Sequence, residues 1–307
     1  MNSVFKYIKE FYHKEFNWLY FSLIIILLGT IIYLNYWHFL EPRYAAGGKT
    51  KIGRFIGYYL LYFIPFATAF FLQLIFFKNC THFKNYWFWV ILILAPAFFS
   101  FRINFDFQEK FILRFWNGYI QHFWTRCINW IVRVFILLIP VFIIWYIKDR
   151  KNQPFYGAKA AGSIKPYLIM LLFMIPLIAL ASTQKDFLQP YPKARYLNYL
   201  DYPFSWWHYI FYELCYGFDF ISIEFFFRGF LILSLIKICG TRCIIPAACF
   251  YCAIHLGKPM GEAISSFWGG ILLGIVSYNT GSIWGGLLVH LGIAWLMEVG
   301  GMIGHSF

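Results

Sequence analysis

Long apolar runs, repeated along almost the whole chain, are the feature that most restricts what this sequence can fold into. Apolar runs of about 18 or more residues are candidates for membrane-spanning helices. The chain is 61% hydrophobic and only 13% charged, whereas soluble domains are usually about half apolar and about 25% charged. We therefore predict an all-α fold, a polytopic transmembrane helical bundle.

We expect about eight or nine spans, because some of the apolar runs are short. The runs lie near residues 18–37, 56–77, 86–101, 128–147, 166–182, 208–236, 243–256, 264–279 and 282–299. The first run follows the mixed-charge stretch FKYIKEFYHKEF, and no small-residue cleavage site comes after it. We interpret it as a retained span rather than a signal peptide, and we expect a multi-pass protein of the cell (inner) membrane.

The formal net charge of +13 does not indicate a nucleic-acid partner. Lysines and arginines are spread over nearly every loop, without the dense cluster that nucleic-acid binding needs. They are typical of loop anchors near lipid head groups, and their distribution does not decide the orientation in the membrane. Cys249 and Cys252 form a CxxC inside an apolar run with no second pair, which favours small packing residues over a redox or zinc motif.

The chain divides into two unequal parts. Residues 1–200 contain transmembrane helices without a recognisable motif, whereas residues 201–307 form the part that we expect to carry the chemistry. Ionisable side chains inside membrane helices mark functional sites by default, because each is costly unless paired or hydrated. In the second part they are Glu213, Asp219, Glu224, Arg228, His255, His290 and Glu298.

The stretch SIEFFFRGF places Glu224 and Arg228 four residues apart in an apolar helix. They lie on one face with the acid first, so they can pair with each other. Glu213 lies eleven residues before Glu224 and returns to nearly the same face, whereas Asp219 points to the opposite side. The stripe therefore holds one carboxylate more than its arginine can neutralise.

Two histidines follow on separate segments. His255 ends the apolar segment FYCAIH, and His290 lies in the middle of the last span. A lone histidine in an apolar helix is typical of a hydrogen-bonded packing residue. Two of them after a Glu/Arg helix favour a reactive site, because imidazole exchanges protons near neutral pH and a carboxylate with it can activate water.

The order of these motifs resembles the CPBP family, which includes type II CAAX prenyl endopeptidases and bacteriocin-processing or self-immunity proteins. The family signature, E-E-x-x-x-R, then aromatic-x-x-x-H, then H-x-x-x-N, appears here as IEFFFRG at 223–229, YCAIH at 251–255 and HLGIA at 290–294. The resemblance covers about residues 200–300. It implies a helical membrane bundle whose motif helices surround a water-accessible cavity.

The resemblance also implies roles for individual residues. His255 corresponds to the histidine that activates water and His290 to an oxyanion donor, whereas Glu224 and Arg228 match the second glutamate and the arginine. Two positions depart from the signature: Ile223 replaces the first glutamate, the expected base, and Ala294 replaces the terminal asparagine. Without an oxyanion donor the barrier typically rises by about 2.7–4 kcal/mol.

Other carboxylates offer replacements for the missing base. We rank Glu224 first, then Glu262 and then Glu298. Glu213 is a weaker choice, since it lies about 16 Å from Glu224 along the helix axis. We expect no cofactor. Zinc held by Glu224, His255 and His290 is the alternative, although the sequence lacks a tight HExxH spacing.

These observations favour an intramembrane endopeptidase that acts on a membrane-embedded or lipid-modified peptide. The alternative is a catalytically inactive relative that serves as a membrane scaffold, chaperone or immunity factor, which Ile223 and Ala294 favour. A proton-coupled transporter is a third hypothesis, because buried His and Glu can relay protons. The absence of a visible internal repeat weakens it.

Overall fold

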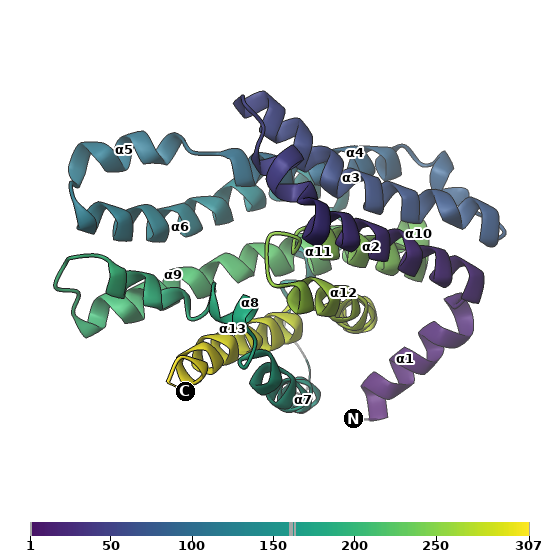
Figure 1. The fold of residues 1–307 in the computed structure, drawn as a ribbon. Coiled ribbons are helices and arrows are strands. Elements are labelled where there is room, and N and C mark those ends of the chain that lie inside the picture. Colours follow the sequence, from purple (N-terminus) through teal and green to yellow (C-terminus); the bar gives the residue numbers. More distant parts are fainter. Residues whose placement is uncertain (1, 160–161, 163, 307) are drawn as a thin grey trace.

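The computed structural model describes residues 2–159, 162 and 164–306, and within these ranges the chain forms helices and no strand (Figure 1). The α-helices are α1 (Asn2–Glu15), α2 (Trp18–His38), α3 (Lys51–Phe76), α4 (Tyr86–Asn104), α5 (Phe107–Phe115), α6 (Tyr119–Ile144), α7 (Lys165–Ala181), α8 (Lys185–Leu188), α9 (Trp206–Glu224), α10 (Ile236–Cys239), α11 (Ile244–Ala253), α12 (Met260–Thr280) and α13 (Trp284–Gly304). Tighter or wider helical turns join them: η1 (Glu41–Ala46), η2 (Thr81–Lys84), η3 (Trp145–Asp149), η4 (Phe155–Gly157), η5 (Lys193–Tyr199), η6 (Phe225–Leu233) and η7 (Gly240–Cys243).

Seven helical segments of the described chain are long and apolar enough to cross a membrane. They are Trp18–His38, Lys51–Phe76, Tyr86–Phe115, Tyr119–Asp149, Trp206–Ala253, Met260–Thr280 and Trp284–Gly304. The prediction of a polytopic helical membrane protein is confirmed. The predicted count of eight or nine is higher than this number, because the runs now seen as α7, with 17 residues, and α11, with 10 residues, do not reach the length of a full span by themselves.

A tight turn at Gly240 folds the segment Trp206–Ala253 into a hairpin. Gly240 has φ 59° and ψ −142°, a backbone conformation that glycine adopts without steric cost. Beyond the turn, α11 returns along η6, so that the ring centroid of Phe227 lies 5.2 Å from that of Phe250 and 4.9 Å from that of Tyr251. The hairpin therefore brings the YCAIH motif beside the Glu224–Arg228 turn.

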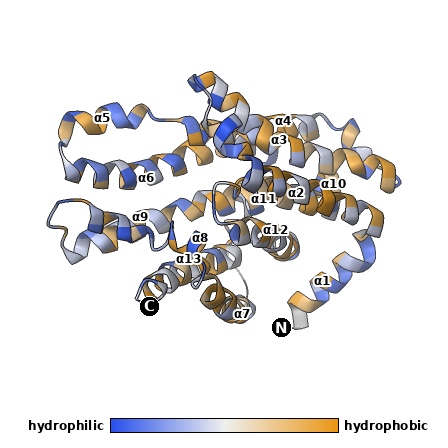
Figure 2. Cartoon of the chain, viewed as in Figure 1, coloured by the Kyte–Doolittle hydropathy of each residue, from blue (hydrophilic) through white to orange (hydrophobic). Residues whose placement is uncertain are grey.

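The two parts of the chain share one apolar core. Phe99 of α4 contacts Phe226 of η6, with ring centroids 5.5 Å apart. Phe66 of α3 contacts Phe250 of α11 at 5.4 Å. Figure 2 shows apolar residues over much of α2, α3 and α4, and more hydrophilic residues in α1 and at the α5 end of α6. Residues 1–200 thus pack around the second part, and a division of the chain near residue 200 stays a prediction.

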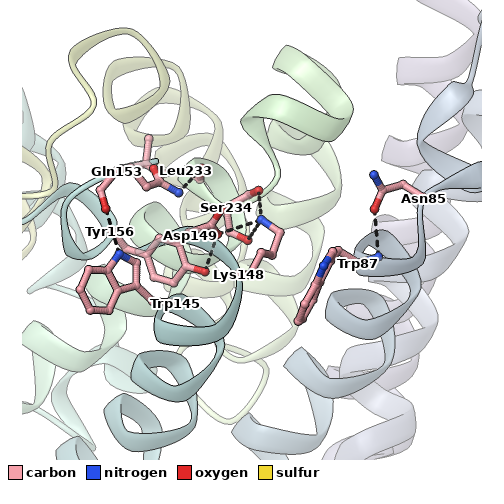
Figure 3. Close-up of polar contacts among 9 residues, drawn as sticks. All are labelled: Asn85, Trp87, Trp145, Lys148, Asp149, Gln153, Tyr156, Leu233 and Ser234. Atoms are coloured by element: carbon pink, nitrogen blue, oxygen red, sulfur yellow. Dashed lines mark hydrogen bonds and ion pairs between the residues drawn. The ribbon is translucent and has the colours of Figure 1, made fainter. Parts of the chain in front are cut away.

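A buried polar cluster fixes the far end of η6 (Figure 3). Lys148 Nζ lies 2.8 Å from Asp149 Oδ2 and donates to the carbonyl oxygen of Ser234 at 3.0 Å. The Tyr156 hydroxyl donates to the same Asp149 oxygen at 2.8 Å. Because Asp149 and Tyr156 are almost fully buried, these mutual contacts satisfy groups that would otherwise be costly. They hold η6 against the end of α6.

Gly229 allows η6 to approach the backbone of η4. A Cβ atom at this position would lie 2.7 Å from the carbonyl oxygen of Tyr156, closer than real contacts allow. Gly229→Ala must therefore push η6 away from η4. We expect a loss of about 1–3 kcal/mol of stability, measured as a lower unfolding midpoint in detergent.

The matched control is Gly269→Ala in α12, where an added Cβ would meet nothing within 4 Å. This variant should unfold like the parent protein or at a slightly higher temperature, because alanine is the better helix former. Equal midpoints for the two variants would contradict the close approach at Gly229.

Candidate functional site

Glu224 lies at the centre of a buried polar cluster. Its side chain is fully buried, and Oε1 lies 3.4 Å from Arg228 Nη1 and 2.9 Å from His290 Nδ1. Gly286 lets α13 come this close, since a Cβ there would lie 2.7 Å from Glu224 Oε2. The i,i+4 geometry explains the contact with Arg228. The contact with His290 depends on how α13 packs against α9 and η6.

His290 uses both ring nitrogens. Nδ1 faces Glu224, and Nε2 lies 3.1 Å from the Tyr251 hydroxyl. A carboxylate can only accept, so Nδ1 carries a proton when Glu224 is ionised. In the neutral imidazole, Nε2 then accepts from the hydroxyl of Tyr251.

Tyr251 is the member of the site that the sequence reasoning missed. The guanidinium carbon of Arg228 lies 4.3 Å from the centre of its ring, and its ring centroid lies 4.6 Å from that of His255. The available signal was its position one turn before His255, on the same helical face. Tyr251 therefore joins the two histidines.

His255 is 5% exposed, and its Nδ1 donates to the carbonyl oxygen of Tyr251 at 2.7 Å. Since a carbonyl only accepts, the proton lies on Nδ1 and Nε2 keeps its lone pair. Burial, together with the charge of Lys258, lowers the pKa of His255 to about 3. The imidazole is therefore neutral at physiological pH and offers Nε2 as an acceptor. We call Glu224, Arg228, Tyr251, His255 and His290 the Glu224 cluster.

The cluster contains buried polar atoms without a hydrogen-bond partner among the described residues. They are Glu224 Oε2 and the Nε, Nη1 and Nη2 atoms of Arg228. Buried polar groups are usually paired, because leaving one unpaired costs roughly 1–3 kcal/mol. A free acceptor and free donors on neighbouring side chains suit a water molecule or a peptide carbonyl.

Glu262 lies at the edge of the cluster, within electrostatic range of His255. Its Oε1 lies 2.5 Å from Lys258 Nζ, and its Oε2 accepts from the Tyr191 hydroxyl at 2.9 Å. Both oxygens of Glu262 are thus occupied, whereas Oε2 of Glu224 has no hydrogen-bond partner among the described residues. This difference favours Glu224 as the carboxylate that is free to take up a proton.

Glu213 and Glu298 form a separate pair. Their carboxyl groups lie within electrostatic range of each other, although both Glu213 oxygens and Glu298 Oε1 have no hydrogen-bond partner among the described residues. Glu298 Oε2 accepts from the backbone N–H of Ala194 at 3.4 Å. Glu213 lies eleven positions before Glu224 on the helix, about 16 Å along its axis. The structure therefore brings Glu224 into contact with His290, which Tyr251 links to His255. Glu213 and Glu298 lie apart from this chain of contacts.

The two positions that depart from the family signature lie in apolar surroundings. Ile223 is 7% exposed within the largest apolar core. Ala294 is 3% exposed and packs in the cluster that contains Tyr212 and Phe220. The side chains of Ile223 and Ala294 are themselves apolar and cannot accept a proton or donate a hydrogen bond as the Glu and Asn of the signature would.

The arrangement of possible metal ligands bears on the zinc alternative. In the part of the chain that the structure describes, no three His, Cys, Asp or Glu side chains gather where they could hold a metal ion. Glu224, His255 and His290 thus do not form a ready ligand set, since Tyr251 stands between the histidines.

A water-filled cavity at the Glu224 cluster stays a prediction. Of the two cavities described, the larger has a volume of about 350 Å³ and lies between α3, α4 and α5, beside Lys51 and Phe101. The other, of about 10 Å³, lies beside Tyr20 and Arg242. The side chains of the cluster are packed closely, so a substrate would have to part the helices around them.

The low pKa of His255 predicts a pH dependence of stability. The unfolded chain binds a proton at His255 below about pH 6.5, whereas the folded protein does so only near pH 3. Stability is therefore lost as the pH falls through this window, by about 2 kcal/mol between pH 6.5 and pH 5. The unfolding midpoint in detergent, measured across this range, should fall less in His255→Gln.

His38→Gln, at an exposed histidine, is the control and should keep the pH dependence of the parent protein. An equally steep loss in His255→Gln would show that His255 is not held neutral by burial.

Comparison with known families agrees with this geometry. Residues 204–296 match the family model described as type II CAAX prenyl endopeptidase Rce1-like. The matched range contains the whole Glu224 cluster and Glu262, and it ends before Glu298. Among curated proteins and solved structures, none matches the chain. The resemblance read from the three motifs is confirmed: residues 204–296 of this multi-pass membrane protein match the Rce1-like family model, within the range where the three motifs lie.

Proposed function

We propose that this protein is an intramembrane endopeptidase that hydrolyses a peptide bond of a membrane-embedded or lipid-modified substrate. The observation that carries the proposal is the continuous contact from Arg228 through Glu224, His290 and Tyr251 to His255. The match to a family described as prenyl endopeptidases supports a lipid-modified peptide as the substrate. We place the protein in the cell membrane.

The attacking water lies between His255 Nε2 and the free oxygen of Glu224 in this mechanism. His255 accepts one hydrogen bond from the water and orients it, because its second nitrogen is fixed by the Tyr251 carbonyl oxygen. With its low pKa, His255 is a poor proton acceptor. Glu224 therefore takes the proton as the water oxygen bonds to the peptide carbon.

Arg228 stabilises the oxyanion that forms. Its N–H groups have no hydrogen-bond partner among the described residues. Preorganised donors stabilise an oxyanion most strongly in a site that excludes bulk water. The C–N bond then breaks as Glu224 returns its proton to the leaving amine. Arg228 thus takes over part of the role that the asparagine at the Ala294 position would have.

His290 holds Glu224 and Tyr251 in place. Its two nitrogens are occupied by these partners, so a role as oxyanion donor would require the Tyr251 hydroxyl to turn away. We therefore propose that His290 orients the base Glu224, as the third residue of a catalytic triad orients its base.

The second candidate is an inactive relative that acts as a scaffold, chaperone or immunity factor. It is favoured by the apolar surroundings of Ile223 and Ala294 and by the contact of Arg228 with Glu224, which compensates the buried charge of the carboxylate. Under this hypothesis the Glu224 cluster would be a structural ion pair.

Glu224→Gln tests the proposal. Glutamine keeps the shape but cannot take up a proton, so we expect kcat to fall about 10²–10⁴-fold. Peptides with and without a prenyl group would be incubated with the full chain in lipid nanodiscs, and the products identified by mass spectrometry. Glu109→Gln, at an exposed position of α5, should be as active as the parent protein.

Glu262→Gln and a zinc chelator separate the remaining mechanisms. We expect cleavage to survive both. Cleavage that persists in Glu224→Gln but is lost in Glu262→Gln would move the base to Glu262. No cleavage of any peptide by the parent protein would support the inactive relative.

A further inference from the structure

The loop that carries His255 is held from outside its own domain. Residues 254–259 connect α11 to α12, and within the loop Lys258 N–H donates to the His255 carbonyl oxygen at 3.0 Å. The carbonyl oxygens of Leu256 and Lys258 accept instead from side chains of the N-terminal part of the chain. A loop whose buried carbonyls lack donors would be costly, so these donors help to decide its conformation.

The donors come from the end of α2. Asn35 Nδ2 donates to the Leu256 oxygen at 2.7 Å across 221 positions of sequence. The Tyr36 hydroxyl donates to the Lys258 oxygen at 2.6 Å. Asn35 is 4% exposed, which is unusual for an asparagine in a membrane helix unless its amide is fully used.

A second set of contacts holds these donors. Asn35 Oδ1 accepts from the backbone N–H of Glu41 at 2.9 Å, which fixes which end of the amide faces the loop. Tyr58 of α3 donates to Glu41 Oε1 at 2.6 Å. The Glu41 carboxylate also lies against Gly257, where an added Cβ would be 3.8 Å from it. We call Asn35, Tyr36, Glu41 and Tyr58 the N-terminal latch.

We propose that Asn35 and Tyr36 are positioning residues for His255, acting through the loop 254–259. The inference rests on the proposed function, in which His255 orients the attacking water. Among the described residues, the imidazole of His255 is hydrogen-bonded only to the backbone one turn earlier, so the path of the loop decides where Nε2 lies. A displacement of about 1 Å in a reacting group can cost about 10²-fold in rate.

The latch gives the first part of the chain a role in the chemistry. Residues 35–58 lie outside the matched range 204–296 and carry no motif of their own. Their contacts nevertheless hold the loop that carries His255. The Rce1-like domain of this protein is thus incomplete without its N-terminal helices.

The experiment compares Asn35→Leu and Tyr36→Phe with the control Tyr33→Phe. Tyr33 lies on the same helix, is 51% exposed and stacks on Trp37. Hydrogen–deuterium exchange of the full chain in nanodiscs follows the amides of residues 254–258, since Pro259 has no backbone N–H. Exchange there should rise about tenfold in both latch variants and stay unchanged in the control.

Kinetics then show whether the loop acts through His255. In the background that retains His255, each latch substitution should lower kcat about tenfold and leave KM within about twofold. In a His255→Ala background the same substitutions should cause no further loss, because their effect passes through the missing imidazole.

Two results would overturn the proposal: unchanged exchange at 254–259 in the latch variants, or a loss of kcat that is equally large without His255. The exchange measurement does not need catalysis. A protein with no peptidase activity but with faster exchange in the latch variants would therefore contradict the proposed function and the positioning role while still showing that the latch holds the loop.

Discussion

Burial of Glu224 is the constraint on which the rest of the site depends. A carboxylate removed from water is tolerated only with charged or hydrogen-bonding partners, and here Arg228 and His290 provide them. Arg228 follows from the helix repeat, whereas His290 requires α13 to pack closely at Gly286. The turn at Gly240 places α11 beside η6, and the absence of a Cβ at Gly229 lets η6 approach η4.

Much of the fold could be predicted from the sequence, because apolar length and helical periodicity are local properties. The spans, the Glu224–Arg228 pair and the two histidine segments are examples. The number of spans was harder to predict, because whether the short helices α7 and α11 cross the membrane depends on how they pack against neighbouring helices. The separation of Glu213 from Glu224 also follows from the helical rise, because eleven residues extend about 16 Å along the axis. The ranking of the carboxylates as bases stays a prediction.

The contacts that give the site its chemistry are tertiary and could not be predicted in this way. The hydrogen bond of the Tyr251 hydroxyl to His290 depends on the distance between α11 and α13. The bonds of Asn35 and Tyr36 to the loop 254–259 join residues more than 200 positions apart. A motif identifies the residue types at a site. Side chains outside the motif determine which atoms of the motif residues remain without a hydrogen-bond partner.

We propose that a water and a peptide carbonyl bind together at Glu224 Oε2, His255 Nε2 and the N–H groups of Arg228. An experimental structure with a non-cleavable lipid-modified peptide tests it most directly. We expect the scissile carbonyl oxygen about 3 Å from Arg228 nitrogens, with a water between Glu224 and His255. A peptide bound elsewhere, for example beside Lys51 and Phe101, with the Glu224 cluster still closed, would contradict it.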